Sequence, residues 1–190
     1  MTEQTQASGA RRMVGRLALW SGLIGAVLLA PLVAMQVADA VVWTASDFAL
    51  MGGLLAAVAV TYEIAARRGA GAYRAAAGTA LATAFLLVWA NGAVGVIGPE
   101  RHPANLMMGA VLAVAIAGAA FVRGRAGPMA VVLCVTAAAQ VVVGVLAGVT
   151  MAAPGDAVGP TALFTALWLG SAALFARAAR RRDKHPASPS

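Results

Sequence analysis

Long apolar stretches alternate with short polar or basic stretches along almost the whole chain. Six apolar stretches stand out, covering about residues 17–36, 47–66, 75–97, 103–122, 128–151 and 160–176. Each is close to the ~20 residues that an α-helix needs to cross the ~30 Å hydrocarbon core of a bilayer. The pattern therefore predicts an all-α fold, an integral membrane bundle of six transmembrane helices.

Residues at the borders of these stretches are typical of helix starts. Pro103, Pro128 and Pro160 each stand where an apolar stretch begins. Proline is tolerated at the first helical position because its missing N–H would be unpaired there. Thr44 and Asp47 have the spacing of a capping box before the second stretch.

The basic residues predict an orientation. If the six helices alternate in direction, thirteen of the fourteen Lys and Arg residues fall on one side of the membrane and only Arg101 falls on the other. Such a bias marks the cytoplasmic side. We therefore expect both termini in the cytoplasm, with a tail at 1–16, a single transmembrane domain at 17–176 and a basic, disordered tail at 177–190.

Composition supports a membrane protein and argues against other classes. The 190 residues are 61% hydrophobic and 11% charged, whereas a soluble domain carries about 25% charged residues. The net charge of +7 would suit nucleic acid, but the basic residues form short clusters between apolar stretches instead of lining one face. The expected partner is the lipid bilayer, and no nucleic acid is expected.

The motifs of several enzyme and cofactor classes are missing from the sequence. It contains no P-loop, no GxSxG and no HExxH. The single cysteine, Cys134, cannot form an internal disulfide or a thiolate metal cage. The single lysine, Lys184, lies in the tail, where it cannot form a retinal Schiff base within a helix. We therefore expect no catalytic residue, no cofactor and no metal, and we favour a protein that is not an enzyme while leaving that alternative open.

Polar residues inside apolar stretches are costly, so each requires an explanation. Glu63 lies near the end of the second stretch, and Arg67 follows on the same helical face. An ion pair with Arg67 or Arg74 at the membrane interface is the simpler interpretation of Glu63. A proton or cation site is the functional alternative.

Asn91 lies in the third stretch, and Gly95 and Gly98 share its helical face. Small residues allow another helix to approach closely, and the amide can form a hydrogen bond across that contact. Helix packing is the simpler interpretation, and a substrate or ion contact is the alternative.

Gln140 is near the middle of the fifth stretch. Thr136, Gly144, Ala147 and Gly148 share its face, and Gly144 and Gly148 form a GxxxG spacing. This spacing is only weak evidence for dimerisation. We expect the stripe to face the interior of the bundle.

Several short motifs in the middle of the chain form a recognisable pattern. They are Trp43-Thr-Ala-Ser-Asp47-Phe48, Tyr62-Glu63, Tyr73-Arg74, Trp89-Ala-Asn91-Gly92-Ala-Val-Gly95-Val-Ile-Gly98-Pro-Glu100 and Pro103-Ala-Asn105. Together they resemble a family of small bacterial multi-spanning membrane proteins of uncharacterised function. The resemblance covers roughly residues 30–150 and is most specific from Trp89 to Asn105.

The resemblance implies no activity. It implies a bacterial cytoplasmic (inner) membrane, and that Glu63, Asn91, Glu100 and Asn105 belong to a recurring pattern. Glu63 and Asn91 differ in depth by roughly 15–20 Å, at ~1.5 Å per helical residue, so they cannot pair. Asn91, Glu100 and Asn105 are close enough in sequence to share one site where the third helix turns into the fourth.

Three functions fit these features. The first is a small transporter or channel-like protein for ions or a small solute, with a polar path from the Asn91–Asn105 corner past Gln140 to Glu63. The second is a non-catalytic accessory protein that binds another membrane protein, or itself, through glycine-rich helix faces. The weakest is a membrane enzyme acting on lipid or quinone, because the sequence lacks a plausible nucleophile–base pair.

Overall fold

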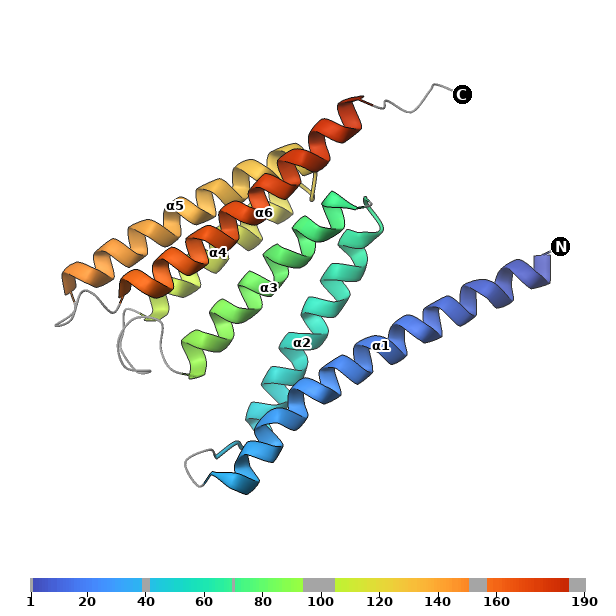
Figure 1. The fold of residues 1–190 in the computed structure, drawn as a ribbon, viewed down its shortest axis with the longest axis horizontal. Coiled ribbons are helices and arrows are strands. Elements are labelled where there is room, and N and C mark those ends of the chain that lie inside the picture. The colour runs from blue at the N-terminus through green and yellow to red at the C-terminus, as the bar shows by residue number, and fades with distance from the viewer. Residues whose placement is uncertain (1, 39–41, 70, 94–104, 151–156, 185–190) are drawn as a thin grey trace. The chain divides into compact units, whose positions relative to one another are not determined.

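The computed structural model describes residues 2–38, 42–69, 71–93, 105–150 and 157–184 (Figure 1). In these residues the regular structure consists of six helices, and no strand occurs among them. Contacts between residues divide the chain into two compact units, Met1–Val60 and Thr61–Ser190.

The first unit contains α1 (Thr2–Val37) and the larger part of α2 (Ala45–Ala66). The apolar span of α1 runs from Val14 to Val37, close to the predicted 17–36. The predicted tail at 1–16 differs from the structure, because α1 begins at Thr2. Alanine, glutamine and arginine in that tail favour helix, and extending an existing helix avoids the cost of nucleating a new one.

The capping box predicted at the start of α2 is confirmed. The Thr44 backbone N–H donates to Asp47 Oδ2 at 2.7 Å, and the Asp47 N–H donates to Thr44 Oγ1 at 3.4 Å. Trp43 packs edge-on against Phe48 with ring centroids 5.2 Å apart. These aromatic residues flank the cap in the positions of a hydrophobic staple, which fixes the direction from which the chain enters the helix.

The second unit contains the end of α2 and four further helices. They are α3 (Ala72–Ala93), α4 (Asn105–Phe121), α5 (Ala126–Thr150) and α6 (Val158–Lys184). α6 packs against both α3 and α5, and α4 packs against α5 (Figure 1). α6 is therefore the helix that joins α3 to the α4–α5 pair.

Two contacts define how α6 lies along its neighbours. On the α5 side, a Cβ added at Gly144 would overlap Thr161, so the two backbones approach closely there. On the α3 side, the Ser171 hydroxyl donates to the Ala76 carbonyl at 2.8 Å, one turn from the edge-on contact of Tyr73 with Phe175. The two pairs on the α3 side, and Gly127 beside Ala179 as a second pair on the α5 side, show that α6 runs antiparallel to both helices.

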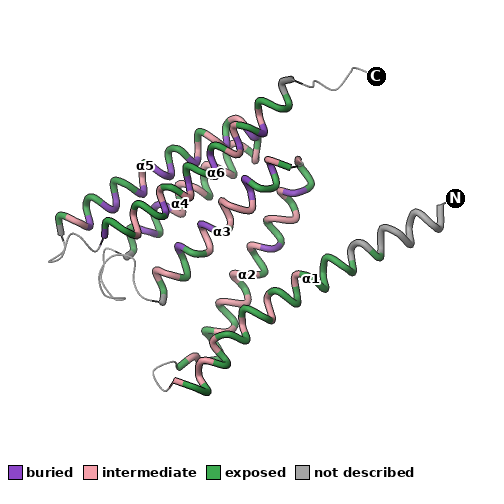
Figure 2. Tube along the Cα trace, in the orientation of Figure 1, coloured by how far each residue is buried: buried purple, intermediate pink, exposed green. Residues whose placement is uncertain are grey.

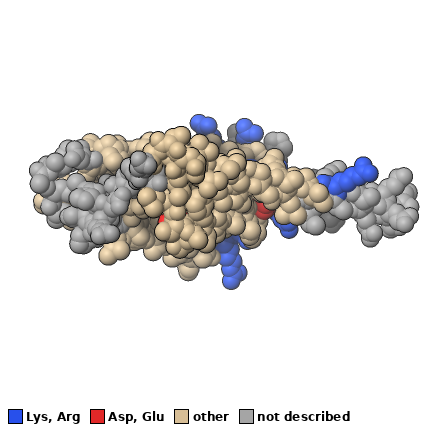
Figure 3. All heavy atoms as spheres, turned by 90° about the horizontal axis from the view of Figure 1, so that it is seen from below, with Lys and Arg blue, Asp and Glu red and all other residues tan. Residues whose placement is uncertain are grey.

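The interior of the second unit is filled by large apolar side chains from every one of its four full helices. The fully buried ones include Leu87 of α3, Met108 of α4, Leu133 of α5 and Trp168 of α6. Many other large apolar side chains point outward, among them Val131, Val142, Val145 and Val149 of α5. Buried and exposed positions alternate along α3, α5 and α6 (Figure 2), and few charged side chains interrupt the surface on the face shown in Figure 3. An apolar exterior around an apolar interior fits a lipid environment.

Five of the described helices are long and apolar enough to cross a membrane. The apolar part of α4, Leu106–Phe121, is shorter, and the predicted stretch 103–122 begins outside the described residues. The described residues thus form six helices and no other regular structure, and the chain is a multi-pass membrane protein, as the sequence predicts.

Several helix boundaries differ from the prediction. α5 and α6 begin before Pro128 and Pro160, because a proline anywhere in the first turn lacks only an N–H that has no partner there. α6 also continues to Lys184, so much of the predicted tail at 177–190 is helical. Ala178 lies in the core, and the arginines around it are good helix formers.

Adding a methyl group at Gly144 tests the close contact between α5 and α6. We expect Gly144→Ala to destabilise the protein by about 1–3 kcal/mol, because the new Cβ overlaps Thr161. Thermal unfolding in detergent measures the change. Gly170→Ala is the matched control: no atom lies within 4 Å of the Cβ site at Gly170, so the better helix propensity of alanine stabilises by up to about 1 kcal/mol. Equal effects at both sites would contradict the contact.

Candidate functional site

Gln140 is the most deeply buried amide in the described residues, with none of its surface exposed. Its Nε2 donates to the Sδ atom of Met108 on α4 at 3.5 Å. A thioether is only a weak acceptor. The other amide atom, Oε1, is buried and has no hydrogen-bond partner among the described residues.

The stripe predicted around Gln140 faces the interior: Thr136, Gly144 and Ala147 are buried, and Gly148 is half-buried.

Two further buried polar atoms without a partner lie on α6. They are the Thr165 hydroxyl oxygen Oγ1 and the Trp168 indole Nε1. Because α5 and α6 are antiparallel and Thr161 lies beside Gly144, one turn along the pair brings Thr165 to the level of Gln140. Trp168 follows one turn further. We call Gln140, Thr165 and Trp168 the buried polar cluster.

Neighbouring buried hydroxyl groups differ from the cluster because they have acceptors. Thr136 donates to the Val132 carbonyl at 3.0 Å, and Thr83 donates to the Thr79 carbonyl at 2.7 Å. Each bond returns to the backbone four residues earlier, which is the usual way for a threonine to be satisfied inside a helix. The cluster atoms have no comparable protein partner among the described residues.

The cluster offers a defined set of hydrogen-bonding groups. Gln140 Oε1 accepts, the Trp168 indole N–H donates, and the Thr165 hydroxyl does either. A buried polar atom left without a hydrogen bond costs about 1–3 kcal/mol. A small molecule that carries both a donor and an acceptor would remove this cost. Among the described residues no buried side chain is charged, so the interior provides no counter-charge for an ion.

Glu63 is half-buried near the end of α2. A Cβ added at Gly78 of α3 would contact the Tyr62 ring, which places Glu63 near the level of Ala77. Ser171 of α6 is bonded to the neighbouring Ala76, and Thr165 lies six residues further along α6. Glu63 is therefore roughly 10 Å from the level of the cluster along the helix axis, at ~1.5 Å per residue.

The corner predicted from Asn91 to Asn105 is described only in part. Asn91 is half-buried in the last turn of α3. Gly95, Gly98 and Glu100 lie outside the described residues, as does the side chain of Asn105, whose backbone begins α4. The proposed sharing of one site by these residues stays a prediction.

Sequence reasoning missed the α6 half of the cluster. A periodic signal was present, because Thr161, Thr165, Trp168, Ala172 and Phe175 recur at the spacing of one helical face. Threonine and tryptophan in an apolar stretch are also compatible with interfacial or packing roles, and only the packing of α6 on α5, with Thr161 against Gly144, places Thr165 at the level of Gln140.

The described residues contain no candidate metal site and no candidate reactive thiol. No group of three or more His, Cys, Asp or Glu residues lies close enough there to hold a metal ion. Cys134 is exposed on the outer side of α5.

The fold and its apolar exterior define the class of this protein as a multi-pass α-helical membrane protein. No protein family, no curated protein and no solved structure matches the chain in sequence or fold. The case for a function therefore rests on the geometry of the chain itself.

Replacing the buried amide tests whether its oxygen lacks a partner. We expect Gln140→Leu to stabilise the protein by about 1 kcal/mol, because leucine has a similar volume and no polar atom to desolvate. Gln140→Ala should instead destabilise by about 2–5 kcal/mol, because it leaves a cavity. Thermal unfolding in detergent distinguishes the two. A clear loss of stability in Gln140→Leu would show that Oε1 is hydrogen-bonded in the native protein.

Proposed function

We propose that this chain is a small transporter of a bacterial cytoplasmic membrane that carries a small, uncharged polar solute. The observation that supports this function is the buried polar cluster. Three hydrogen-bonding atoms, on Gln140, Thr165 and Trp168, are enclosed in the interior without a partner among the described residues. Unsatisfied polar groups at the centre of a membrane bundle are expensive and are typical of solute pathways.

An uncharged solute fits the cluster better than an ion. The cluster provides one acceptor, one donor and one hydroxyl group, all neutral. Moving an ion into such an interior without a counter-charge costs far more than neutral hydrogen bonds return. A molecule with adjacent N–H or O–H and C=O groups matches the available atoms.

A transporter fits better than an open pore because the helices around the cluster are tightly packed. α5 approaches α6 closely where Gly144 lies beside Thr161, and it approaches α4 closely where Gly118 lies beside Val132. Movement of a solute through the second unit would require these helices to separate and close again. Alternating exposure of a central site is how secondary transporters work.

The same proposal includes an orientation. Arginines follow the ends of α2 and α4 and lie in the last turns of α6 in the second unit, and arginines also precede the apolar span of α1. The positive-inside rule then assigns both termini to the cytoplasm. It also assigns the half-buried Glu63 to the cytoplasmic half of the path.

The accessory role is the second function that the sequence suggested, and it needs open glycine faces. Gly144 is not open, because Thr161 of the same chain lies against it. Gly144 of the GxxxG pair therefore serves to pack α5 against α6 within this chain. Other glycines, such as Gly22, Gly25 and Gly53, are open, so the preference for transport rests on the buried polar cluster.

Solute flux in liposomes tests the proposed function. The reconstituted protein should accelerate the entry of urea or glycerol, followed by light scattering after an osmotic step. Thr165→Val should reduce the protein-dependent rate about 10-fold, by removing a hydroxyl that contacts the solute and is worth about 1.4 kcal/mol.

Thr136→Val is the matched control. It makes the same chemical change on the neighbouring helix, but its hydroxyl is already bonded to the Val132 carbonyl. We expect the control to retain the wild-type rate. Identical rates in wild type, Thr165→Val and empty liposomes would contradict the proposal.

The same liposomes test the alternative that the protein carries protons or cations. A pH-sensitive dye reports proton flux in wild type and in Glu63→Gln. For a carrier of neutral solutes, both should stay at the leak level of empty liposomes. Wild-type proton flux above that level, lost in Glu63→Gln, would favour a cation path and overturn the choice of an uncharged solute.

A further inference from the structure

A second polar region lies at one end of the second unit, where three chain segments meet. The loop from α2 to α3, the turn from α4 to α5 and the last turns of α6 come together there. We call this region the basic end. Its sequence segments carry ten basic residues, Arg67, Arg68, Arg74, Arg123, Arg125, Arg177, Arg180, Arg181, Arg182 and Lys184, against two acidic residues, Glu63 and Asp183.

Hydrogen bonds to backbone carbonyls hold the loops of the basic end in place. Arg68 Nη1 donates to the Arg123 carbonyl, and the Tyr73 hydroxyl donates to the Gly124 carbonyl at 2.7 Å. Arg123 and Gly124 both have positive φ angles, of 50° and 67°. This left-handed turn is unfavourable for arginine, so the bonds from Arg68 and Tyr73 stabilise a specific loop shape.

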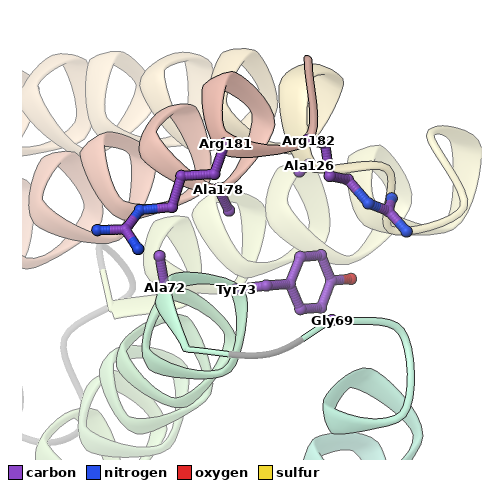
Figure 4. A pocket seen from close by; sticks show the side chains of 7 residues that line it. All are labelled: Gly69, Ala72, Tyr73, Ala126, Ala178, Arg181 and Arg182. Carbon is purple, nitrogen blue, oxygen red and sulfur yellow. The ribbon is translucent and has the colours of Figure 1, made fainter. Parts of the chain in front are cut away.

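A pocket of about 210 Å³ opens between these segments (Figure 4). Its lining comes from the α2–α3 loop, the first residues of α3 and α5, and the end of α6: Gly69, Ala72, Tyr73, Ala126, Ala178, Arg181 and Arg182. The two arginine side chains extend in different directions over the pocket, and the Tyr73 ring lies between them in this view. The alanines give the pocket an apolar wall beside its two charges.

The guanidinium groups at the pocket keep most of their donors available. Arg181 is exposed and makes no hydrogen bond or ion pair with the residues that the structure describes. Arg182 makes one long bond, from Nη2 to the Arg68 carbonyl at 3.4 Å. Each guanidinium has five N–H donors, and this planar group binds phosphate oxygens in pairs.

The backbone adds to the positive potential. Ala72 and Ala126 are the first residues of α3 and α5, so two helix N-termini end at the pocket. The N-terminal end of a helix carries a partial positive charge and unpaired N–H groups. Two N-termini, two arginines and an apolar wall thus combine at one concave site.

We propose that this pocket binds the phosphate of an anionic phospholipid headgroup. It lies at the ends of membrane-spanning helices, where headgroups are the nearest phosphates. The arginines bind the phosphate oxygens, and Ala72, Ala126 and Ala178 contact the adjoining glycerol and upper acyl chain. Basic pockets between transmembrane helices are a known form of headgroup site. The assignment does not depend on the transport function.

Binding of fluorescent phosphatidylglycerol to the purified full-length chain in neutral detergent micelles tests this site. Arg181→Gln/Arg182→Gln should weaken binding roughly 30-fold, since each arginine near an anionic lipid contributes about five-fold. Arg181→Gln alone, which removes no described hydrogen bond, should weaken it about five-fold. Fluorescent phosphatidylcholine should bind equally weakly to all variants.

The matched control is Arg177→Gln/Arg180→Gln. It removes the same charge from the same helix, at two exposed residues that do not line the pocket. We expect its affinity to fall clearly less than that of the pocket double variant, because neither arginine lines the pocket that holds the phosphate. Equal weakening in both double variants, or unchanged binding in Arg181→Gln, would overturn the pocket assignment.

Competition with inorganic phosphate distinguishes a lipid headgroup from free phosphate as the ligand of the pocket. For a headgroup site, millimolar phosphate should not displace the labelled lipid, because it lacks the glycerol and acyl contacts. Displacement at micromolar phosphate would overturn the lipid assignment and identify a site for free phosphate.

Discussion

The lack of water in the hydrocarbon core is the constraint on which the rest of this structure depends. Each backbone N–H and C=O group must find its partner within the chain, and a helix satisfies them locally. The six helices, and the outward-facing valines of α5, follow from that requirement. Because lipid does not drive apolar surfaces together, the helices associate through close packing and a few polar contacts.

α6 shows how those contacts are distributed. Toward α5, the missing side chain of Gly144 brings the backbones together, so dispersion forces act over a short distance. Toward α3, the Ser171 hydroxyl binds the Ala76 carbonyl and Phe175 meets the Tyr73 ring. One helix therefore uses two mechanisms, close packing on one side and hydrogen-bond and ring contacts on the other, to unite the second unit.

Polar groups in this unit fall into two classes with different consequences. At the basic end, arginine and tyrosine side chains bond to the carbonyls of Arg123, Gly124, Ala66 and Gly69, and so stabilise the loops. In the interior, Gln140, Thr165 and Trp168 retain buried atoms that no described residue satisfies. The first class explains the architecture. The second class costs stability and gives a reason to look for a ligand.

The sequence by itself determined the helical membrane fold, the approximate spans, the cap at Thr44 and the inward direction of Gln140. These features depend on local periodicity and on the cost of polar groups in lipid, which can be read within one segment. Only the tertiary structure decided that Thr165 lies at the level of Gln140, that Gly144 is filled by Thr161, and that Arg181 and Arg182 flank a pocket with Tyr73. Each of these depends on which helices are neighbours and in what register. Periodicity shows which face of a helix is buried. It does not show which neighbouring helix packs against that face, or in what register.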